Sequence, residues 1–211
     1  MNDFTAVGAA CATQSHNARG RPHHGMVARR LLDGLPCPRA RILDVGCGDG
    51  EMTPRPAVAG HRVTGPASSS GMLRAAAERV AADPHVREAS VSVEADLCSP
   101  PFAMAKFDTD CCHGVLMYLD EPTGAVARPA ALVAPGGVSS IPTKNRRALG
   151  LLPRQGVRTF HDLLPGDRAP DEDAYAAALE TEWTTSSRSP FRNMGRQVHV
   201  PARREPGGVT P

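Results

Sequence analysis

The stretch 41–50, Arg-Ile-Leu-Asp-Val-Gly-Cys-Gly-Asp-Gly, constrains the fold of this chain more than any other part of the sequence. Its apolar start is typical of a buried β-strand that ends at Asp44, and glycines follow at positions 46, 48 and 50. A glycine turn of this kind lets a ligand lie against the backbone and leaves N–H groups at the edge of a sheet. The dinucleotide fingerprint needs a glycine three positions after its second one, but position 51 is Glu. The turn alone therefore indicates another nucleotide-type site or a plain tight turn.

Composition narrows the class of protein. The 211 residues suffice for one domain with a core, and the 20 glycines and 20 prolines indicate many loops. No stretch reaches 18 apolar residues and the amino end lacks an apolar signal segment, so we expect a cytoplasmic protein with no membrane partner. The six cysteines form no C-x-x-C pair, so we expect reduced thiols and no metal site.

The charges are distributed unevenly along the chain. Residues 1–41 carry six basic and two acidic side chains, residues 42–140 carry seven and twelve, and residues 141–211 carry eleven and eight. This layout fits an acidic core between segments that attract polyanions such as RNA. An ordinary solvated surface explains it equally well.

Periodicity and turn residues predict alternating strands and helices. We expect strands at 42–45, 61–65, 89–95, 107–116 and 138–143, and helices at 26–33, 51–59, 70–82 and 121–132. The alternation predicts an α/β fold, a Rossmann-like parallel sheet with helices on both faces, whose ligand lies beyond the carboxyl ends of the strands. Prolines 54, 56, 129 and 142 interrupt these elements, and one proline inside a helix costs about 3 kcal/mol.

Further segments follow the glycine turn in an order that resembles class I S-adenosylmethionine (SAM)-dependent methyltransferases. The pair Asp96-Leu97 follows the third strand, 107–122 resembles the motif of the fourth strand, and 134–138 resembles the turn before the fifth. The resemblance implies SAM as the cofactor. It implies cofactor contacts from Asp44, Gly46, Cys47, Gly48, Gly50, Asp96, Leu97 and His113.

Several of these side chains also have a purely structural interpretation. His113 follows the fourth strand near the expected site of methyl transfer, but a structural histidine is an alternative. Cys111 and Cys112 are expected to be strand residues that face opposite sides of the sheet, not nucleophiles. We assign no catalytic residue from the sequence.

The carboxyl-terminal segments 156–162 and 188–204, with the amino-terminal segment 4–21, resemble the tRNA 5-carboxymethoxyuridine methyltransferase family. The resemblance implies that the carboxylate of a modified uridine in tRNA is methylated; this acceptor is an anion and needs no general base. The alternatives are a small-molecule acceptor or a non-catalytic remnant that binds the cofactor weakly. The candidate substrate residues are Lys144, Asn145, Arg158 and His161, for which solvated loop and edge positions are the alternative.

The sequence departs from that family at three places. Ala67 stands where an acid is expected at the end of the second strand, and His23 stands where an Arg is expected to meet the cofactor carboxylate. Only ten residues, 146–155, separate Asn145 from Gly156, and a parallel crossover usually needs a dozen or more. We therefore expect 156–160 not to return to the sheet in the family's register, which leaves the carboxyl-terminal part incomplete. The expected parts are a helical cap (1–40), a SAM-binding core (41–145) and a shortened segment of the same domain (146–211).

Overall fold

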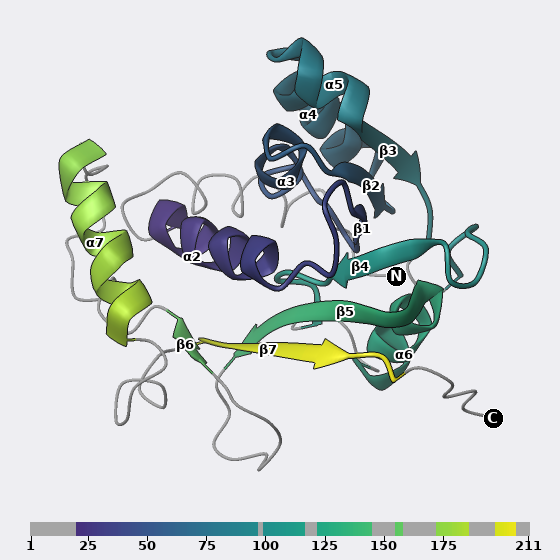
Figure 1. Cartoon of the computed structure of the whole chain (residues 1–211). Helices are drawn as coiled ribbons and strands as arrows, with labels where there is room; N and C mark the ends of the chain where they lie inside the picture. The colour runs from purple at the N-terminus through teal and green to yellow at the C-terminus, as the bar shows by residue number, and fades with distance from the viewer. Residues whose placement is uncertain are drawn as a thin grey trace.

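The computed structural model describes residues 20–96, 99–116, 122–144, 155–157, 172–185 and 197–205. These residues form an α/β fold around one seven-stranded sheet with the strand order β3-β2-β1-β4-β5-β7-β6 (Figure 1). The strands are β1 (Arg41–Asp44), β2 (Arg62–Ala67), β3 (Ser90–Glu94), β4 (Phe107–Cys111), β5 (Val133–Lys144), β6 (Gln155–Val157) and β7 (Gln197–Arg203). The helices are α2 (Gly20–Asp33), α3 (Pro54–Val58), α4 (Ser70–Ala81), α5 (Pro84–Ala89), α6 (Pro122–Leu132) and α7 (Glu172–Thr185).

The first five strands are parallel, and β7 runs antiparallel to both β5 and β6. The order of the parallel strands reverses between β1 and β4. In open α/β sheets a ligand binds outside the carboxyl ends of the strands at such a switch point. The expected fold class is therefore confirmed, and the glycine turn after β1 lies at this switch point.

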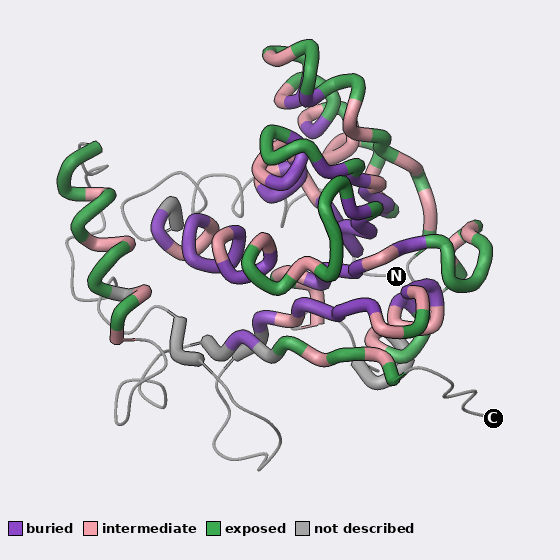
Figure 2. The backbone as a smooth tube through the Cα atoms, viewed as in Figure 1, coloured by how far each residue is buried: buried purple, intermediate pink, exposed green. Residues whose placement is uncertain are grey.

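Helices cover both faces of the sheet, as the alternation of side chains along β1 shows. Ile42 packs in a buried cluster with Leu31 of α2, whereas Leu43 packs in another with Leu132 of α6. Since neighbouring residues of a strand point to opposite faces, α2 and α6 lie on opposite sides of the sheet. Figure 2 shows that buried residues concentrate on α2 and the central strands, while α7 is largely exposed. Among the described residues, no helix is long and apolar enough to cross a membrane.

The prolines explain why several expected boundaries are wrong. The helix expected at 51–59 is confined to Pro54–Val58, because proline lacks an N–H and fits only the first turn, where Pro54 lies. The second strand, expected to end at Gly65, extends through Pro66 to Ala67 and pairs with β3. The fifth strand starts at Val133, so the expected turn at 135–137 lies within β5, where its pairing with β4 shifts register.

Two further boundaries differ from expectation. The helix α5 was not expected; Pro84 opens it, and the Asp83 carboxylate caps it by accepting hydrogen bonds from the N–H groups of His85 and Val86. The fourth strand ends at Cys111 and does not reach 116; Gly114, at φ +72°, already lies outside it.

The carboxyl-terminal strands belong to the same sheet as the core. Gln155–Val157 pair antiparallel with β7, Gln155 lying opposite His199, so residues 156 and 157 do return to the sheet. That they do not do so in the family's register stays a prediction. The outer edge of β7 offers backbone groups for this pairing, and a short antiparallel ladder is enough to form β6. Residues 158–160 lie outside the described part. The division at 40 and 145 remains a prediction.

Candidate functional site

The backbone of the glycine turn is left-handed at every second residue. Gly46, Gly48 and Gly50 have φ angles of +66°, +57° and +77°. At Gly50 an added Cβ would lie 2.9 Å from the Cβ of Ala76, so the turn packs directly against α4. An added Cβ at Gly48 would meet nothing closer than 3.9 Å, which leaves the surface beside this residue open. The turn therefore has bare backbone on its open side and close packing on the other.

Hydrogen bonds fix the turn to the end of β2. The N–H groups of Gly46 and Cys47 both donate to the carbonyl of Pro66, at 3.0 and 3.2 Å. Leu43 pairs with Thr64, and the same register carried three residues on places Gly46 level with Ala67. Ala67 is buried and has no polar side chain. The structure thus supports the strand register in which Ala67 replaces an acid at the edge of the site.

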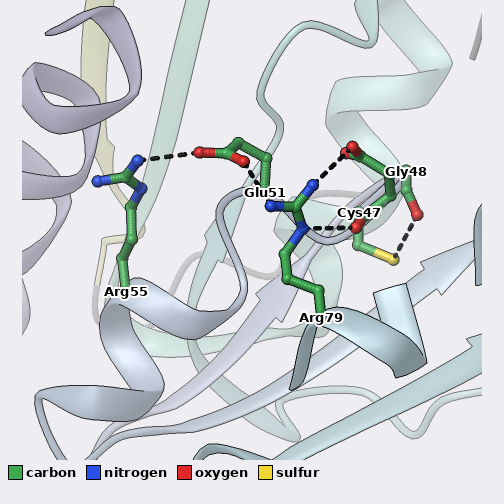
Figure 3. Close-up of polar contacts among 6 residues, drawn as sticks. Cys47, Gly48, Glu51, Arg55 and Arg79 are labelled. Carbon is green, nitrogen blue, oxygen red and sulfur yellow. Dashed lines mark hydrogen bonds and ion pairs between the residues drawn. The ribbon is translucent and has the colours of Figure 1, made fainter. Parts of the chain in front are cut away.

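Arg79 of α4 binds the carboxyl-terminal end of the glycine turn (Figure 3). Its Nε donates to the carbonyl of Asp49 at 3.1 Å, and its two terminal nitrogens lie 2.9 Å from the Asp49 carboxylate and 3.0 Å from that of Glu51. Glu51 also pairs with Arg55 of α3 at 3.0 Å. We call Asp49, Glu51, Arg55 and Arg79 the loop clasp. Sequence reasoning did not find it, because Arg79 lies 30 residues from Asp49.

We expect Arg79→Met to lower the free energy of unfolding by about 1–3 kcal/mol, because hydrogen bonds to charged groups in a partly buried network are lost. SAM should also bind several-fold more weakly, since the turn loses its link to α4. Urea denaturation and calorimetric titration measure the two effects. Arg74→Met, on the same helix but exposed, is the matched control and should change neither quantity. Equal effects in both variants would contradict a specific role of the loop clasp.

Asp44 lies beneath the turn. It is 3% exposed and accepts hydrogen bonds from the Thr53 hydroxyl at 2.8 Å and the Cys111 thiol at 3.7 Å. Burial raises the pKa of the Asp44 carboxyl to about 6, although both hydrogen bonds oppose this shift. The contacts show a role in joining β1, the start of α3 and β4. A direct contact with the cofactor remains a prediction.

The buried thiols are held in their neutral form. Burial is the largest cause that raises the pKa of Cys47 and of Cys111 above the usual range of a thiol, and it raises the pKa of Cys112 to about 12. A thiol with a raised pKa is a poor nucleophile because the thiolate is the reactive form. The expected strand position is confirmed for Cys111 and wrong for Cys112, because β4 ends at Cys111. Both are buried, and they pack in the two clusters on opposite faces of the sheet, as expected.

The remaining predicted residues differ in how far the structure places them. Asp96 is exposed two residues after β3, and His113 follows β4 at the edge where Asp44 pairs with Cys111. Lys144 ends β5, and its backbone pairs with Gln197. His23 lies on α2, its ring 5.1 Å from that of His24. Outside the described residues lie Leu97, Asn145, Arg158 and His161.

At the same edge of the sheet, one hydroxyl of β5 lies between two histidines, one that follows β4 and one on β7. The Ser140 hydroxyl of β5 lies 3.1 Å from Nε2 of His113 and 2.8 Å from Nε2 of His199 on β7. His199 is 2% exposed. Burial lowers the pKa of His199 to about 4 and that of His113 well below its usual value, so both rings are neutral near pH 7. Sequence reasoning missed Ser140 and His199, since only the pairing of β5 with β7 brings them together.

Comparison with known proteins agrees with this geometry. Residues 43–141 match the family described as a methyltransferase domain. A ubiquinone biosynthesis O-methyltransferase from Paracidovorax citrulli is 36% identical over 162 residues, which cover 68% of this chain and 66% of the relative. A tRNA 5-carboxymethoxyuridine methyltransferase from Escherichia coli K12 is 23% identical, with 83% and 84% covered. A solved structure of a proposed SAM-dependent methyltransferase from Methanococcus maripaludis is 14% identical with a TM-score of 0.64, and 100% of this chain covers 98% of it.

The curated relatives match this chain over only part of their own length. The chain spans 51–66% of the length of the first three curated relatives, which are all ubiquinone biosynthesis O-methyltransferases. The expected resemblance to class I methyltransferases is confirmed for the core. Residues 43–141 therefore form a class I methyltransferase domain, whose cofactor is S-adenosylmethionine.

Proposed function

We propose that this chain transfers the methyl group of SAM to an oxygen atom of a small-molecule acceptor. The observation that carries the proposal is the left-handed glycine turn at the switch point, with the His113–Ser140–His199 group at the same edge of the sheet. Relatives at 31–36% identity are named as O-methyltransferases of ubiquinone biosynthesis and of malonyl-[acyl-carrier protein]. These names support oxygen as the methylated atom.

The residues at the site fit the cofactor in part. The backbone of 46–50 would face its amino acid portion, and Asp96 and His113 stand at the ends of neighbouring strands. SAM supplies a methyl group bound to a positively charged sulfur. Ala67 offers no carboxylate to the ribose hydroxyls, and a missing charged hydrogen bond costs about 1.5–3 kcal/mol. We therefore expect a cofactor affinity roughly ten- to a hundred-fold weaker than with an acid there.

A second candidate is methylation of 5-carboxymethoxyuridine in tRNA. It is favoured by the length of the match to the Escherichia coli enzyme, which extends over 83% of this chain and 84% of the enzyme. The lower identity of 23% favours the small-molecule acceptor.

Calorimetric titration with SAM is the first test. Binding is expected, and no heat together with no thermal shift at millimolar cofactor would overturn both enzyme assignments in favour of a non-catalytic remnant. Radiolabelled methyl transfer then separates the acceptors. Label in small phenols or hydroxy acids supports the first candidate, whereas label in bulk tRNA that mild ester hydrolysis removes supports the second.

Ala67→Asp tests the cofactor position directly. Because residue 67 is level with Gly46 at the edge of the sheet, a carboxylate there should tighten SAM binding at least several-fold. The same carboxylate is desolvated without the cofactor, so the free protein should become less stable. Titration and thermal unfolding with and without SAM measure both effects. Ala67→Asn, which carries no charge, is the control. Unchanged affinity in the Asp variant would mean that residue 67 does not face the ribose.

A further inference from the structure

The strand β3 is the outermost strand on one side of the sheet, and its outer edge has little to prevent pairing with another chain (Figure 1). Its residues Ser90–Glu94 pair with β2 in one unbroken parallel register, without a bulge. The strand contains no lysine and no proline, and its one charged residue is Glu94 at the end. Natural proteins blunt outer strands with lysine, proline or a bulge, because an unprotected edge pairs with further strands.

Backbone hydrogen bonds show which residues of this edge face outward. The Ala95 N–H, just after β3, donates to the Ala67 carbonyl of β2 at 3.1 Å. Backbone groups of successive strand residues point to alternate sides, so Ser92 and Glu94 direct their N–H and C=O groups away from β2. Ser90 directs its carbonyl the same way, while its N–H is bonded within the end of α5. Among the described strands, none pairs with these outward groups.

A second copy of this chain fits the edge when a two-fold axis passes through Ser92. This antiparallel register places Ser92 opposite Ser92 of the second copy, Val91 opposite Val93, and Ser90 opposite Glu94. The two Ser92 residues then exchange N–H···O=C hydrogen bonds, and each Glu94 N–H reaches a Ser90 carbonyl. Every other symmetric register leaves residues of both strands without a partner in the other copy. The sequence of β3 is therefore complementary to itself in one register.

The same register brings valine side chains together. Val91 aligns with Thr64 of β2, which aligns with Leu43 of β1, so Val91 and Val93 lie on the α6 face of the sheet. On that face α6 packs against β4 and β5, which lie on the other side of β1. Val91 is 57% exposed. Pairing two copies would set Val91 and Val93 of both chains side by side, and such cross-strand contacts stabilise antiparallel strands.

Charges at the two ends of this edge are complementary. Arg87, in the last turn of α5, precedes Ser90 by three residues and is exposed, and Glu94 is exposed at the other end. In the antiparallel register Glu94 of one copy lies opposite Ser90 of the other, close to the Arg87 of that copy. The two-fold axis repeats this meeting of opposite charges at both ends, which favours a second copy of this chain over an unrelated strand. The neighbouring Glu88 is exposed as well, so the pair is tested by exchanging its charges.

We propose that the outer edge of β3 is an interface between two copies of this chain in solution, paired antiparallel about Ser92 into one continuous sheet. The inference goes beyond the proposed methyltransferase function and does not depend on it. A five-residue ladder is a small interface, so the dimer is weak, with a dissociation constant of roughly 10–100 micromolar. Because the paired strands run in opposite directions, the glycine turns of the two copies face opposite ends of the assembly.

Sedimentation velocity over a concentration series that spans this range is the test. The unaltered chain should pass from monomer to dimer and stop there. Val91→Glu should weaken the dimer by about ten-fold or more, because it adds two carboxylates between the two Glu94 side chains. Val58→Glu is the matched control: Val58 is 70% exposed but lies on α3, on the opposite face of the sheet, so dimerisation should not change. Thermal unfolding of dilute samples should be the same for both variants.

Two further variants test the register itself. Ser92→Pro removes the outward N–H at the two-fold axis and leaves the bonds to β2, because proline is tolerated in an outer strand whose N–H faces solvent. It should therefore abolish the dimer. Arg87→Glu and Glu94→Arg should each weaken the dimer, whereas the two changes combined should restore it by re-forming the pair with reversed sign.

Three results would overturn the proposal. The first is a monomer at every concentration, the second a dimer that Val91→Glu and Val58→Glu weaken equally, and the third an assembly that keeps growing beyond two copies. SAM titration separates this inference from the proposed function. The Val91→Glu variant should bind SAM as tightly as the unaltered chain, since the glycine turn is outside the interface. Failure of the unaltered chain to bind SAM would count against the proposed function alone.

Discussion

Gly50→Ala is expected to lower the free energy of unfolding by about 2–5 kcal/mol and to remove most of the affinity for SAM. The left-handed φ of +77° costs a residue with a Cβ about 1–2 kcal/mol. The new Cβ would also lie 2.9 Å from the Cβ and 3.0 Å from the Cα of Ala76, and overpacking of this kind costs about 1–3 kcal/mol. Against a total stability of roughly 5–15 kcal/mol, this is a large effect. Urea denaturation and SAM titration measure it.

Two further variants separate the strain from the clash. Gly60 has a similar φ of +88°, and an added Cβ there would meet no atom within 4 Å, so Gly60→Ala should lose only the strain contribution. Adding Ala76→Gly to Gly50→Ala removes the opposing methyl group and should restore part of the stability, less about 1 kcal/mol for glycine in a helix. If Gly50→Ala and Gly60→Ala lost equal stability, the packing of the turn against α4 would not matter.

The parts of the fold that the sequence predicted depend on local rules. The glycine turn after β1 could be located because left-handed backbone demands glycine, and the strand before it because a parallel strand is buried on both faces. The order of elements followed from the alternation of such strands with helices. Some predicted boundaries near prolines were wrong because the surrounding structure decides whether a strand tolerates a proline. Pro66 is an example, since it lies in β2, which pairs with β1 on one side and β3 on the other.

The polar groups of the site could not be predicted for a different reason. Arg79 acts on Asp49 across 30 residues, and His199 meets Ser140 across 59. No periodicity or spacing in one sequence encodes such pairs, because the sheet order and helix packing bring them together. His113 was identified as a site residue from its place after the fourth strand, while its partners required the β5–β7 pairing.

Four buried titratable groups change the free energy of unfolding in opposite directions as the pH falls. Burial lowers the pKa of His199 from 6.5 to about 4 on folding, and it lowers the pKa of His113 well below 6.5. The unfolded chain then binds more protons than the folded one, so stability is lost as pH falls from 6.5 to 4. The pKa values of Asp44 and Asp110 rise from 3.8 to about 6. Here the folded chain binds more protons, and stability is gained as pH falls from 6 to about 4.

These opposite contributions should partly cancel in the unaltered chain between pH 6 and 4. A shift of one pKa unit corresponds to about 1.4 kcal/mol, so His199 and each carboxyl contribute roughly 3 kcal/mol over the window. Asp110→Asn keeps an acceptor for the Ser139 hydroxyl but cannot take up the proton, so relative to the unaltered chain its stability should fall by about 3 kcal/mol from pH 6 to 4. His199→Gln keeps a polar partner for Ser140, and relative to the unaltered chain its stability should rise by a similar amount over the same pH range.

The decisive measurement is the slope of the free energy of unfolding against pH in the two variants. A substitution that only weakens the fold lowers this free energy equally at every pH and leaves the slope unchanged. Urea denaturation at half-unit steps from pH 4 to 7 measures each profile, and the m-value checks that the unfolding transition stays the same. Asp108→Asn is the control: the Arg41 guanidinium lowers the pKa of Asp108, so this carboxyl titrates below the window. Parallel profiles for Asp110→Asn and His199→Gln would show that burial does not hold these groups neutral.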